Sequence, residues 1–204
     1  MRGQMLDNAK ARAIASAVVD PLARGLLRTG LTPNVVTFFT STAVSVIVLL
    51  TWSRGEFLMG LLLCAPMVFG DLLDGTMARL SGKTSKWGSF LDSVMDRVTD
   101  SAILISMILY VHSDSEDVYV AFGAAALATG SLIPYIRAKA ESIGVECKVG
   151  LMERSERLFV VLIAGICSAA GITSAIGYAL IVLSVLNTVT VVQRMNAVRK
   201  SVSS

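Results

Sequence analysis

Residues 71–79 read Asp-Leu-Leu-Asp-Gly-Thr-Met-Ala-Arg, and two further aspartates, Asp92 and Asp96, follow them. These acidic residues lie within or beside segments that are apolar enough to be membrane helices, where burying one carboxylate costs roughly 2.5–3.5 kcal/mol on insertion scales. On a helix, Asp71 and Asp74 are three residues apart and Asp92 and Asp96 are four apart, so each pair shares a face. Two such faces turned toward each other make an oxygen-rich pocket, the environment that hard divalent cations select. The segment therefore predicts a cation site.

The composition is that of an integral membrane protein. Of the 204 residues, 54% are hydrophobic, and several apolar runs approach the roughly 20 residues that are needed to cross a bilayer. The expected fold class is therefore all-α, with a bundle of six transmembrane helices in a single membrane domain that covers residues 1–204. The expected spans, of which the fifth is short, are about 34–52, 57–78, 92–112, 118–138, 158–170 and 174–193.

The first thirty residues predict an amphipathic helix, about residues 4–28, that lies on the membrane surface. Charged residues interrupt every apolar run in this segment, which argues against a signal peptide. Ile14, Leu22 and Leu26 recur at roughly helical spacing, opposite several basic positions. A surface helix packed on the bundle is an alternative that does not exclude the first.

Basic residues are distributed unevenly among the predicted connections. Seventeen of the 18 Lys and Arg residues lie in the N-terminal segment, in the second and fourth connections with their flanks, and in the C-terminal tail. The three opposite loops contain Arg54 alone. By the positive-inside rule the richer side faces the cytoplasm. We therefore expect a multi-pass protein of the cell (plasma) membrane, with both termini and the aspartate motif facing the cytoplasm.

The aspartate motif resembles the signature of a known enzyme family. Read as D-x2-D-G-x2-A-R-x8-G-x3-D-x3-D, all eight fixed positions are present between Asp71 and Asp96. This pattern is similar to that of the CDP-alcohol phosphatidyltransferases, integral membrane enzymes of phospholipid synthesis. The resemblance implies transfer of a phosphatidyl group from CDP-diacylglycerol to an alcohol, with release of CMP. It also implies a homodimer in contact with membrane lipid, and it gives no role to nucleic acid.

The resemblance assigns roles to the motif residues. Asp71, Asp74 and Asp92 are expected to bind magnesium or manganese, with two ions in the site, because paired metals can clamp both phosphates of a pyrophosphate. Asp96 is expected to act as general base toward the acceptor hydroxyl and to serve as a further metal ligand. Contacts to CDP-diacylglycerol are expected from Gly75, Arg79 and Ser85 and, upstream, from Asn34 and Thr37; for Asn34 a helix cap is the alternative.

A second set of basic residues concerns the acceptor alcohol. Several cations at the cytoplasmic ends of the later spans suit an acceptor that itself carries a phosphate. The segments 135–142 and 150–157 look like those of an actinobacterial subgroup of the family, the phosphatidylinositol phosphate synthases, which take inositol 1-phosphate. Glycerol 3-phosphate is the alternative acceptor. The residues expected to bind the acceptor phosphate are Arg137, Lys139, Arg154, Arg157 and Arg194.

Other interpretations of the motif predict different features. A cation transporter would place carboxylates near the middle of the bilayer with access from both sides, whereas these aspartates flank a polar loop that is expected to be cytoplasmic. A non-catalytic lipid-binding relative would be expected to lack a motif aspartate, and none is missing. A structural network would pair the aspartates with Arg79 and Arg97. Asp100 lies one turn beyond Asp96, outside the motif, and is expected to be a hydrogen-bonded residue of the bundle.

Overall fold

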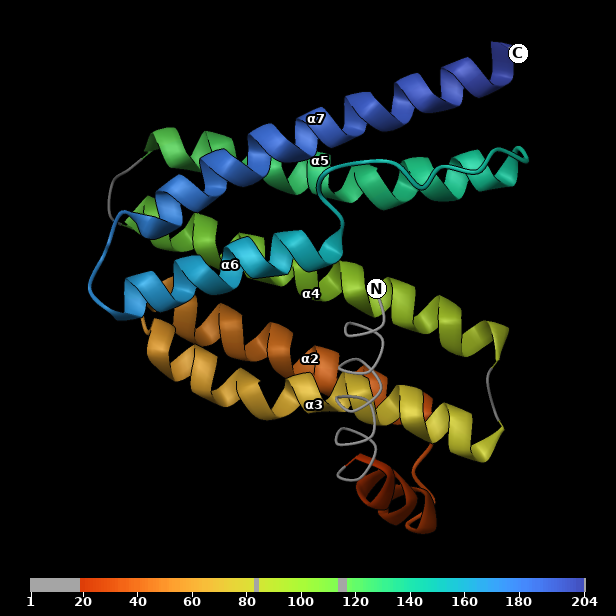
Figure 1. Cartoon of the computed structure of the whole chain (residues 1–204). Coiled ribbons are helices and arrows are strands. Elements are labelled where there is room, and N and C mark those ends of the chain that lie inside the picture. The colour runs from red at the N-terminus through yellow and green to blue at the C-terminus, as the bar shows by residue number, and fades with distance from the viewer. Residues whose placement is uncertain (1–18, 83–84, 114–116, 204) are drawn as a thin grey trace, which may run out of the picture. The chain divides into compact units, whose positions relative to one another are not determined.

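The computed structural model describes residues 19–82, 85–113 and 117–203, with the backbone alone for residues 68–69 and 71–72. All regular elements in these ranges are helical, as the sequence predicts (Figure 1). Residues 19–28 form a helix, and the N-terminal part of the predicted amphipathic helix, residues 4–18, lies outside the described residues. The elements that follow are α2 (Pro33–Thr51), η1 (Trp52–Arg54), α3 (Phe57–Ser81), α4 (Lys86–Ser113), α5 (Asp117–Ser142), α6 (Arg154–Ala169) and α7 (Ala175–Ser203).

Each of the six predicted apolar stretches corresponds to one long helix. Three segments, Pro33–Arg54, Asp117–Ser142 and Ala175–Ser203, are long and apolar enough to cross a membrane. Phe57–Met67 is a shorter apolar run within α3. Several boundaries differ from the prediction. α4 begins six residues earlier than expected and α6 begins four residues earlier, while α5 continues four residues further and α7 continues ten residues further. Each of these extensions contains charged residues, which a search for apolar runs does not detect.

The described chain forms two compact units. The first combines the residues up to Ser45 with Leu63–Thr99, and the second combines Val46–Leu62 with the chain from Asp100 onward. The motif aspartates belong to the first unit, whereas the basic residues expected to bind the acceptor belong to the second.

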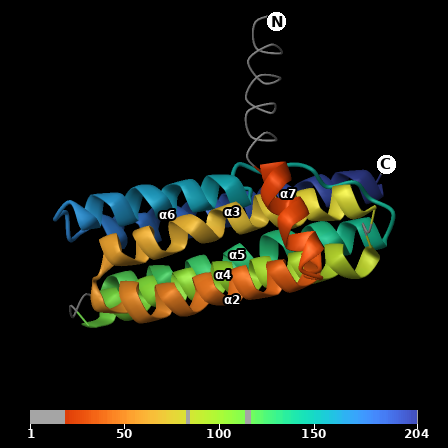
Figure 2. The ribbon, with the colours of Figure 1, turned by 90° about the horizontal axis from the view of Figure 1, so that it is seen from below.

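In the first unit, α2 and α3 lie side by side (Figure 1). Pro33 is the first residue of α2, where its fixed φ angle suits a helix start. The carbonyl oxygen of Thr32 accepts from the N–H groups of Val35 and Val36. Figure 2 shows that the helix of residues 19–28 and α2 point in different directions.

In the second unit, α7 packs against both α5 and α6. The outer face of α6 exposes four large apolar side chains at helical spacing, whereas Val161, Ala164 and Gly165 are buried on the opposite face. Such a division is typical of a helix with one face against protein and the other against an apolar surrounding. The exposed side chains of α6 are Phe159, Leu162, Ile163 and Ile166.

Candidate active site

The motif aspartates lie on two helices of the first unit. Asp74 lies on α3, while Asp92 and Asp96 lie one turn apart on α4. Asp92 is exposed, and Asp74 and Asp96 are partly buried. The side chain of Asp71 lies outside the described residues, but the α3 backbone is helical from Asp71 to Asp74, so the two positions share a face as predicted.

A hydrogen bond holds one of these carboxylates from a neighbouring helix. The Thr37 hydroxyl on α2 donates to Asp74 Oδ2 over 2.5 Å. The Thr37 side chain is buried, and the length is within the range for a hydroxyl that donates to an ionised carboxylate. The structure thus gives Thr37 a contact with a motif aspartate, which the sequence interpretation did not anticipate.

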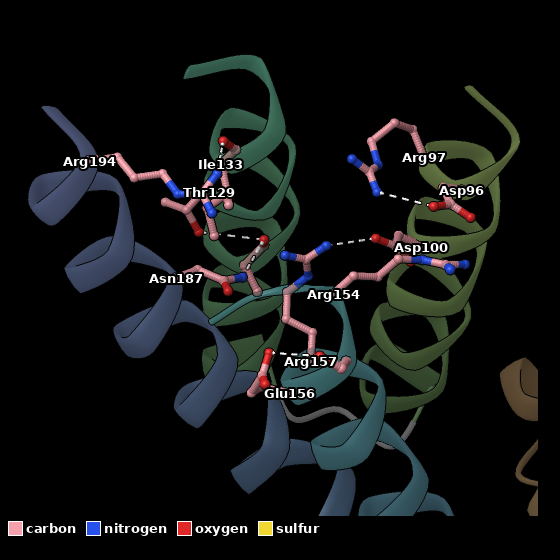
Figure 3. Close-up of polar contacts among 12 residues, drawn as sticks. Asp96, Arg97, Asp100, Thr129, Ile133, Arg154, Glu156, Arg157, Asn187 and Arg194 are labelled. Atoms are coloured by element: carbon pink, nitrogen blue, oxygen red, sulfur yellow. Dashed lines mark hydrogen bonds and ion pairs between the residues drawn. The ribbon is translucent and has the colours of Figure 1, made fainter. Parts of the chain in front are cut away.

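Arg97 lies beside the last motif aspartate. Its Nη2 is 3.8 Å from Asp96 Oδ2, and both side chains are partly exposed (Figure 3). A pair at this distance and exposure is worth at most about 1 kcal/mol. The pairing with Arg97 that the structural interpretation predicts therefore exists for Asp96, but it is too weak to explain why the carboxylate is placed there.

The other motif positions leave a face of α3 open. A Cβ added at Gly75 would meet no described atom within 4 Å, so within the described part of the chain no helix packs against this residue. Arg79 is exposed and donates from Nη2 to the Thr76 hydroxyl over 2.9 Å, one turn earlier on the same helix. The contact with Thr76 orients the guanidinium at the end of α3.

Ser85 and Asn34 lie at the start of α4 and α2. The Gly88 N–H donates to Ser85 Oγ over 2.9 Å, which makes Ser85 the N-cap of α4. A Cβ added at Gly88 would lie 3.0 Å from Asn34 Oδ1, so the amide of Asn34 lies close to this turn. Because α2 begins at Pro33, Asn34 is inside the first turn, and the alternative interpretation as a helix cap is wrong.

The oxygen-only character of the motif side chains fits a hard divalent cation. Among the side chains that the structure describes, which do not include Asp71, no three His, Cys, Asp or Glu groups lie close enough together to hold a metal ion. The Thr37 bond to Asp74 is the kind of outer contact that orients a ligating carboxylate. The donor types therefore fit magnesium or manganese, and the metal-ligand assignment stays a prediction.

In the second unit, one carboxylate joins two of the predicted acceptor-binding arginines. Asp100 Oδ2 accepts from Arg157 Nη2 over 2.8 Å, and Asp100 Oδ1 accepts from Arg154 Nε over 3.4 Å (Figure 3). The Arg157 side chain is 9% exposed and that of Asp100 is 16% exposed. The expectation that Asp100 is a hydrogen-bonded residue of the bundle is thereby confirmed.

Arg194, on α7, links this helix to two other segments. Its Nε donates to the carbonyl oxygen of Val149 over 2.8 Å, and its Nη1 donates to that of Ile133 over 2.7 Å. Thr190, one turn earlier, accepts from the N–H of Met152 over 3.0 Å. These contacts fasten the loop before α6 to α7, and that loop leads directly into the turn that carries Arg154 and Arg157.

The remaining basic candidates are more exposed. Arg137 Nε donates to Glu141 Oε1 over 3.0 Å, one turn further along α5, and Lys139 is exposed on the same helix. In the loop before α6, Lys148 pairs with Glu146. The hydrogen bond and the positive charge of Lys148 hold the pKa of the Glu146 carboxyl below its ordinary value.

Asn187 is a buried polar residue that the sequence interpretation missed. Its side chain on α7 is fully buried, and its Nδ2 donates to the carbonyl oxygen of Ala126 over 3.3 Å. Its Oδ1 has no hydrogen-bond partner within the described part of the chain. A single asparagine inside an apolar run was the available signal. The cavity beside it is lined by Asp100, Arg157 and Asn187 with Ile103, Leu104, Leu158, Val161 and Leu183.

Comparison with known proteins identifies the same family that the aspartate motif resembles. Residues 30–194 match the family model for the CDP-alcohol phosphatidyltransferases. The chain belongs to the CDP-alcohol phosphatidyltransferase family. The match includes every motif aspartate and all five predicted acceptor-binding residues, and it makes this protein a CDP-diacylglycerol-dependent transferase.

Relatives of this transferase come from actinobacteria. It is 39% identical to a phosphatidylinositol phosphate synthase of Cutibacterium acnes, over 95% of this chain and 98% of the relative. It is 38% identical to one of Streptomyces avermitilis, over 97% of this chain and 84% of that relative.

Two crystal structures of a phosphatidylinositol phosphate synthase of Mycobacterium tuberculosis are also similar to this transferase. Each matches with a TM-score of 0.84 at 33% identity over 89% of this chain. The matches cover 89% and 94% of the respective crystallised chains. One structure is a complex with manganese and citrate, and the other has CDP-diacylglycerol bound.

Proposed function

We propose that this transferase moves the phosphatidyl group of CDP-diacylglycerol to a hydroxyl of inositol 1-phosphate, giving phosphatidylinositol phosphate and CMP. The observation that carries the proposal is the 39% identity to a phosphatidylinositol phosphate synthase over nearly the whole of both chains. The complete aspartate motif and the CDP-diacylglycerol bound to a similar structure support the donor.

The acceptor assignment is supported by the arginines at the start of α6. Arg157 uses one of its N–H groups on Asp100, and within the described residues no other partner engages it. Both Arg154 and Arg157 lie in the first turns of the helix, where the helix dipole is positive. Together with Asp100, which pairs with both, the two arginines keep a net positive charge at a positive helix end, which suits a phosphate more than serine or an uncharged alcohol. Arg194, Arg137 and Lys139 complete the proposed phosphate-binding set.

In the proposed reaction, Asp96 removes the proton of the acceptor hydroxyl. The hydroxyl oxygen attacks the phosphorus that carries diacylglycerol, a new P–O bond forms, and the bond to the CMP oxygen breaks, so that CMP leaves with the electron pair. Asp71, Asp74, Asp92 and Asp96 would hold two magnesium or manganese ions, which neutralise phosphate charge when bound. The nucleotide part of CDP-diacylglycerol is contacted by Asn34, Gly75, Arg79 and Ser85. Ser85 also caps the start of α4.

We further propose that all six long helices cross the membrane, with the aspartate motif and both termini in the cytoplasm. The apolar outer face of α6 supports a position in the membrane for this short helix. The distribution of 17 of the 18 basic residues on one side supports the orientation. As in the family, the active form is expected to be a homodimer.

The test is identification of the lipid product. Purified protein is incubated with CDP-diacylglycerol, magnesium and isotope-labelled inositol 1-phosphate, and the lipids are analysed by mass spectrometry. A labelled phosphatidylinositol phosphate confirms the proposal. Labelled glycerol 3-phosphate tested in parallel distinguishes the alternative acceptor, because its product, phosphatidylglycerophosphate, has a different mass.

A further inference from the structure

The contact between α2 and α3 is unusually close at one point. A Cβ added at Gly70 would lie 2.3 Å from Thr40 Cγ2, so only glycine permits this approach. The next pair of facing residues is Thr37, three positions before Thr40, and Asp74, four positions after Gly70. α2 and α3 run antiparallel, so moving one turn back along α2, from Thr40 to Thr37, corresponds to moving one turn forward along α3, from Gly70 to Asp74. Close packing at Gly70 therefore brings the Thr37 hydroxyl within reach of the Asp74 carboxylate.

The hydroxyl of Thr37 behaves differently from other hydroxyls on α2. Thr40 donates to the carbonyl oxygen of Val36 over 2.9 Å, and Ser45 to that of Ser41 over 2.8 Å. These are the ordinary bonds of Ser and Thr in a helix, to the carbonyl four residues earlier. For Thr37 the corresponding distance to Pro33 is 3.1 Å, whereas the distance to Asp74 Oδ2 is 2.5 Å. The single hydroxyl hydrogen is therefore directed to the carboxylate.

We propose that Thr37 is a positioning residue that fixes the Asp74 carboxylate for metal binding, rather than a contact of the nucleotide. The inference rests on the proposed function, in which Asp74 is a metal ligand. A carboxylate rotates easily about its last side-chain bond, which has a broad torsional minimum. A donor on Oδ2 removes that freedom, and the donor itself is held firmly because Thr is β-branched and here is buried.

Outer contacts of this kind have a known effect on metal sites. Loss of a hydrogen bond to a ligating group typically lowers metal affinity or activity 10- to 100-fold. Thr37→Val removes the hydroxyl while keeping the shape of the side chain, and Thr37→Ser restores the hydroxyl. Thr40→Val is a matched control, because Thr40 is on the same helix, lies against α3 and, among the residues that the structure describes, donates only to carbonyl oxygens of α2.

The test measures Mn²⁺ binding directly, without turnover. Electron paramagnetic resonance of free Mn²⁺ gives the Kd for the purified full-length protein and for each variant, and thermal unfolding confirms that all are folded. We expect Thr37→Val to raise the Kd roughly 10- to 100-fold, Thr37→Ser to recover most of the affinity, and Thr40→Val to match the unmodified protein.

Other outcomes overturn the proposal in distinguishable ways. Equal Mn²⁺ affinity in Thr37→Val and the unmodified protein would overturn the positioning role alone. If the same variant raised the KM for CDP-diacylglycerol with unchanged Mn²⁺ affinity, Thr37 would be a nucleotide contact. An unmodified protein that binds no Mn²⁺ would overturn both this inference and the metal site of the proposed function.

Discussion

Replacing Asp100 by Asn is expected to destabilise the protein far more than replacing a surface carboxylate of the same kind. The change leaves the buried guanidinium of Arg157 without its counter-charge, while Arg154 loses the same partner. Breaking a buried ion pair by removing one partner costs about 3–5 kcal/mol. Because Asp100 is 16% exposed and Asn retains a hydrogen-bond acceptor, the lower end, about 3 kcal/mol, is expected here.

Glu141→Gln is the matched control for this substitution. It also converts a carboxylate that is paired with an arginine into an amide, but Arg137 and Glu141 are 45% and 54% exposed. Exposed pairs one turn apart in a helix contribute roughly 0.3–0.5 kcal/mol. For a chain of this size, about 3 kcal/mol corresponds to a Tm shift of about 6–12 °C, against about 1–2 °C for the control.

The assay is thermal unfolding of detergent-solubilised protein, followed by tryptophan fluorescence. A double variant, Asp100→Leu with Arg157→Met, replaces the pair by apolar groups and should recover part of the loss, because no buried charge is left uncompensated. Equal shifts in Tm for Asp100→Asn and Glu141→Gln would refute the reasoning, since the buried pair would then be no stronger than an exposed one.

Two further predictions concern catalysis. Asp96→Asn should abolish turnover and leave CDP-diacylglycerol binding largely intact, measured by CMP release and by equilibrium binding; lost binding would contradict the role of general base. Arg157→Ala and Arg194→Ala should each raise the acceptor KM more than the KM for CDP-diacylglycerol, and equal effects on both KM values would place these arginines outside the acceptor site.

Much of the fold could be predicted because membrane helices are encoded by long apolar runs, which are easily detected in a sequence. Apolar runs located all six long helices, and the motif spacing correctly predicted which positions share a helical face. The helix starts were harder to predict, because charged first turns do not appear in a search for apolar runs. Hydropathy placed the beginning of α6 at Leu158, whereas the charged turn from Arg154 is already helical. The cap at Ser85 could have been recognised from a serine placed before a helix.

The contacts between helices could not be read from the sequence. The bond between Thr37 and Asp74 depends on the distance between α2 and α3, which Gly70 sets, and spacing within one helix carries no information about this distance. Likewise, the partners of Asp100 could not be predicted from the motif, because Arg154 and Arg157 lie more than fifty residues away from it in sequence. Sequence reasoning found the residue types of the site, and packing determines which of them touch.

The central claim is tested most directly by CMP release from CDP-diacylglycerol and magnesium with four acceptors compared: inositol 1-phosphate, glycerol 3-phosphate, free inositol and serine. We expect inositol 1-phosphate alone to stimulate CMP release, and chelation of the metal to abolish it. Preference for glycerol 3-phosphate would contradict the acceptor assignment while keeping the motif chemistry. No release with any of the four would contradict the proposed transferase reaction itself.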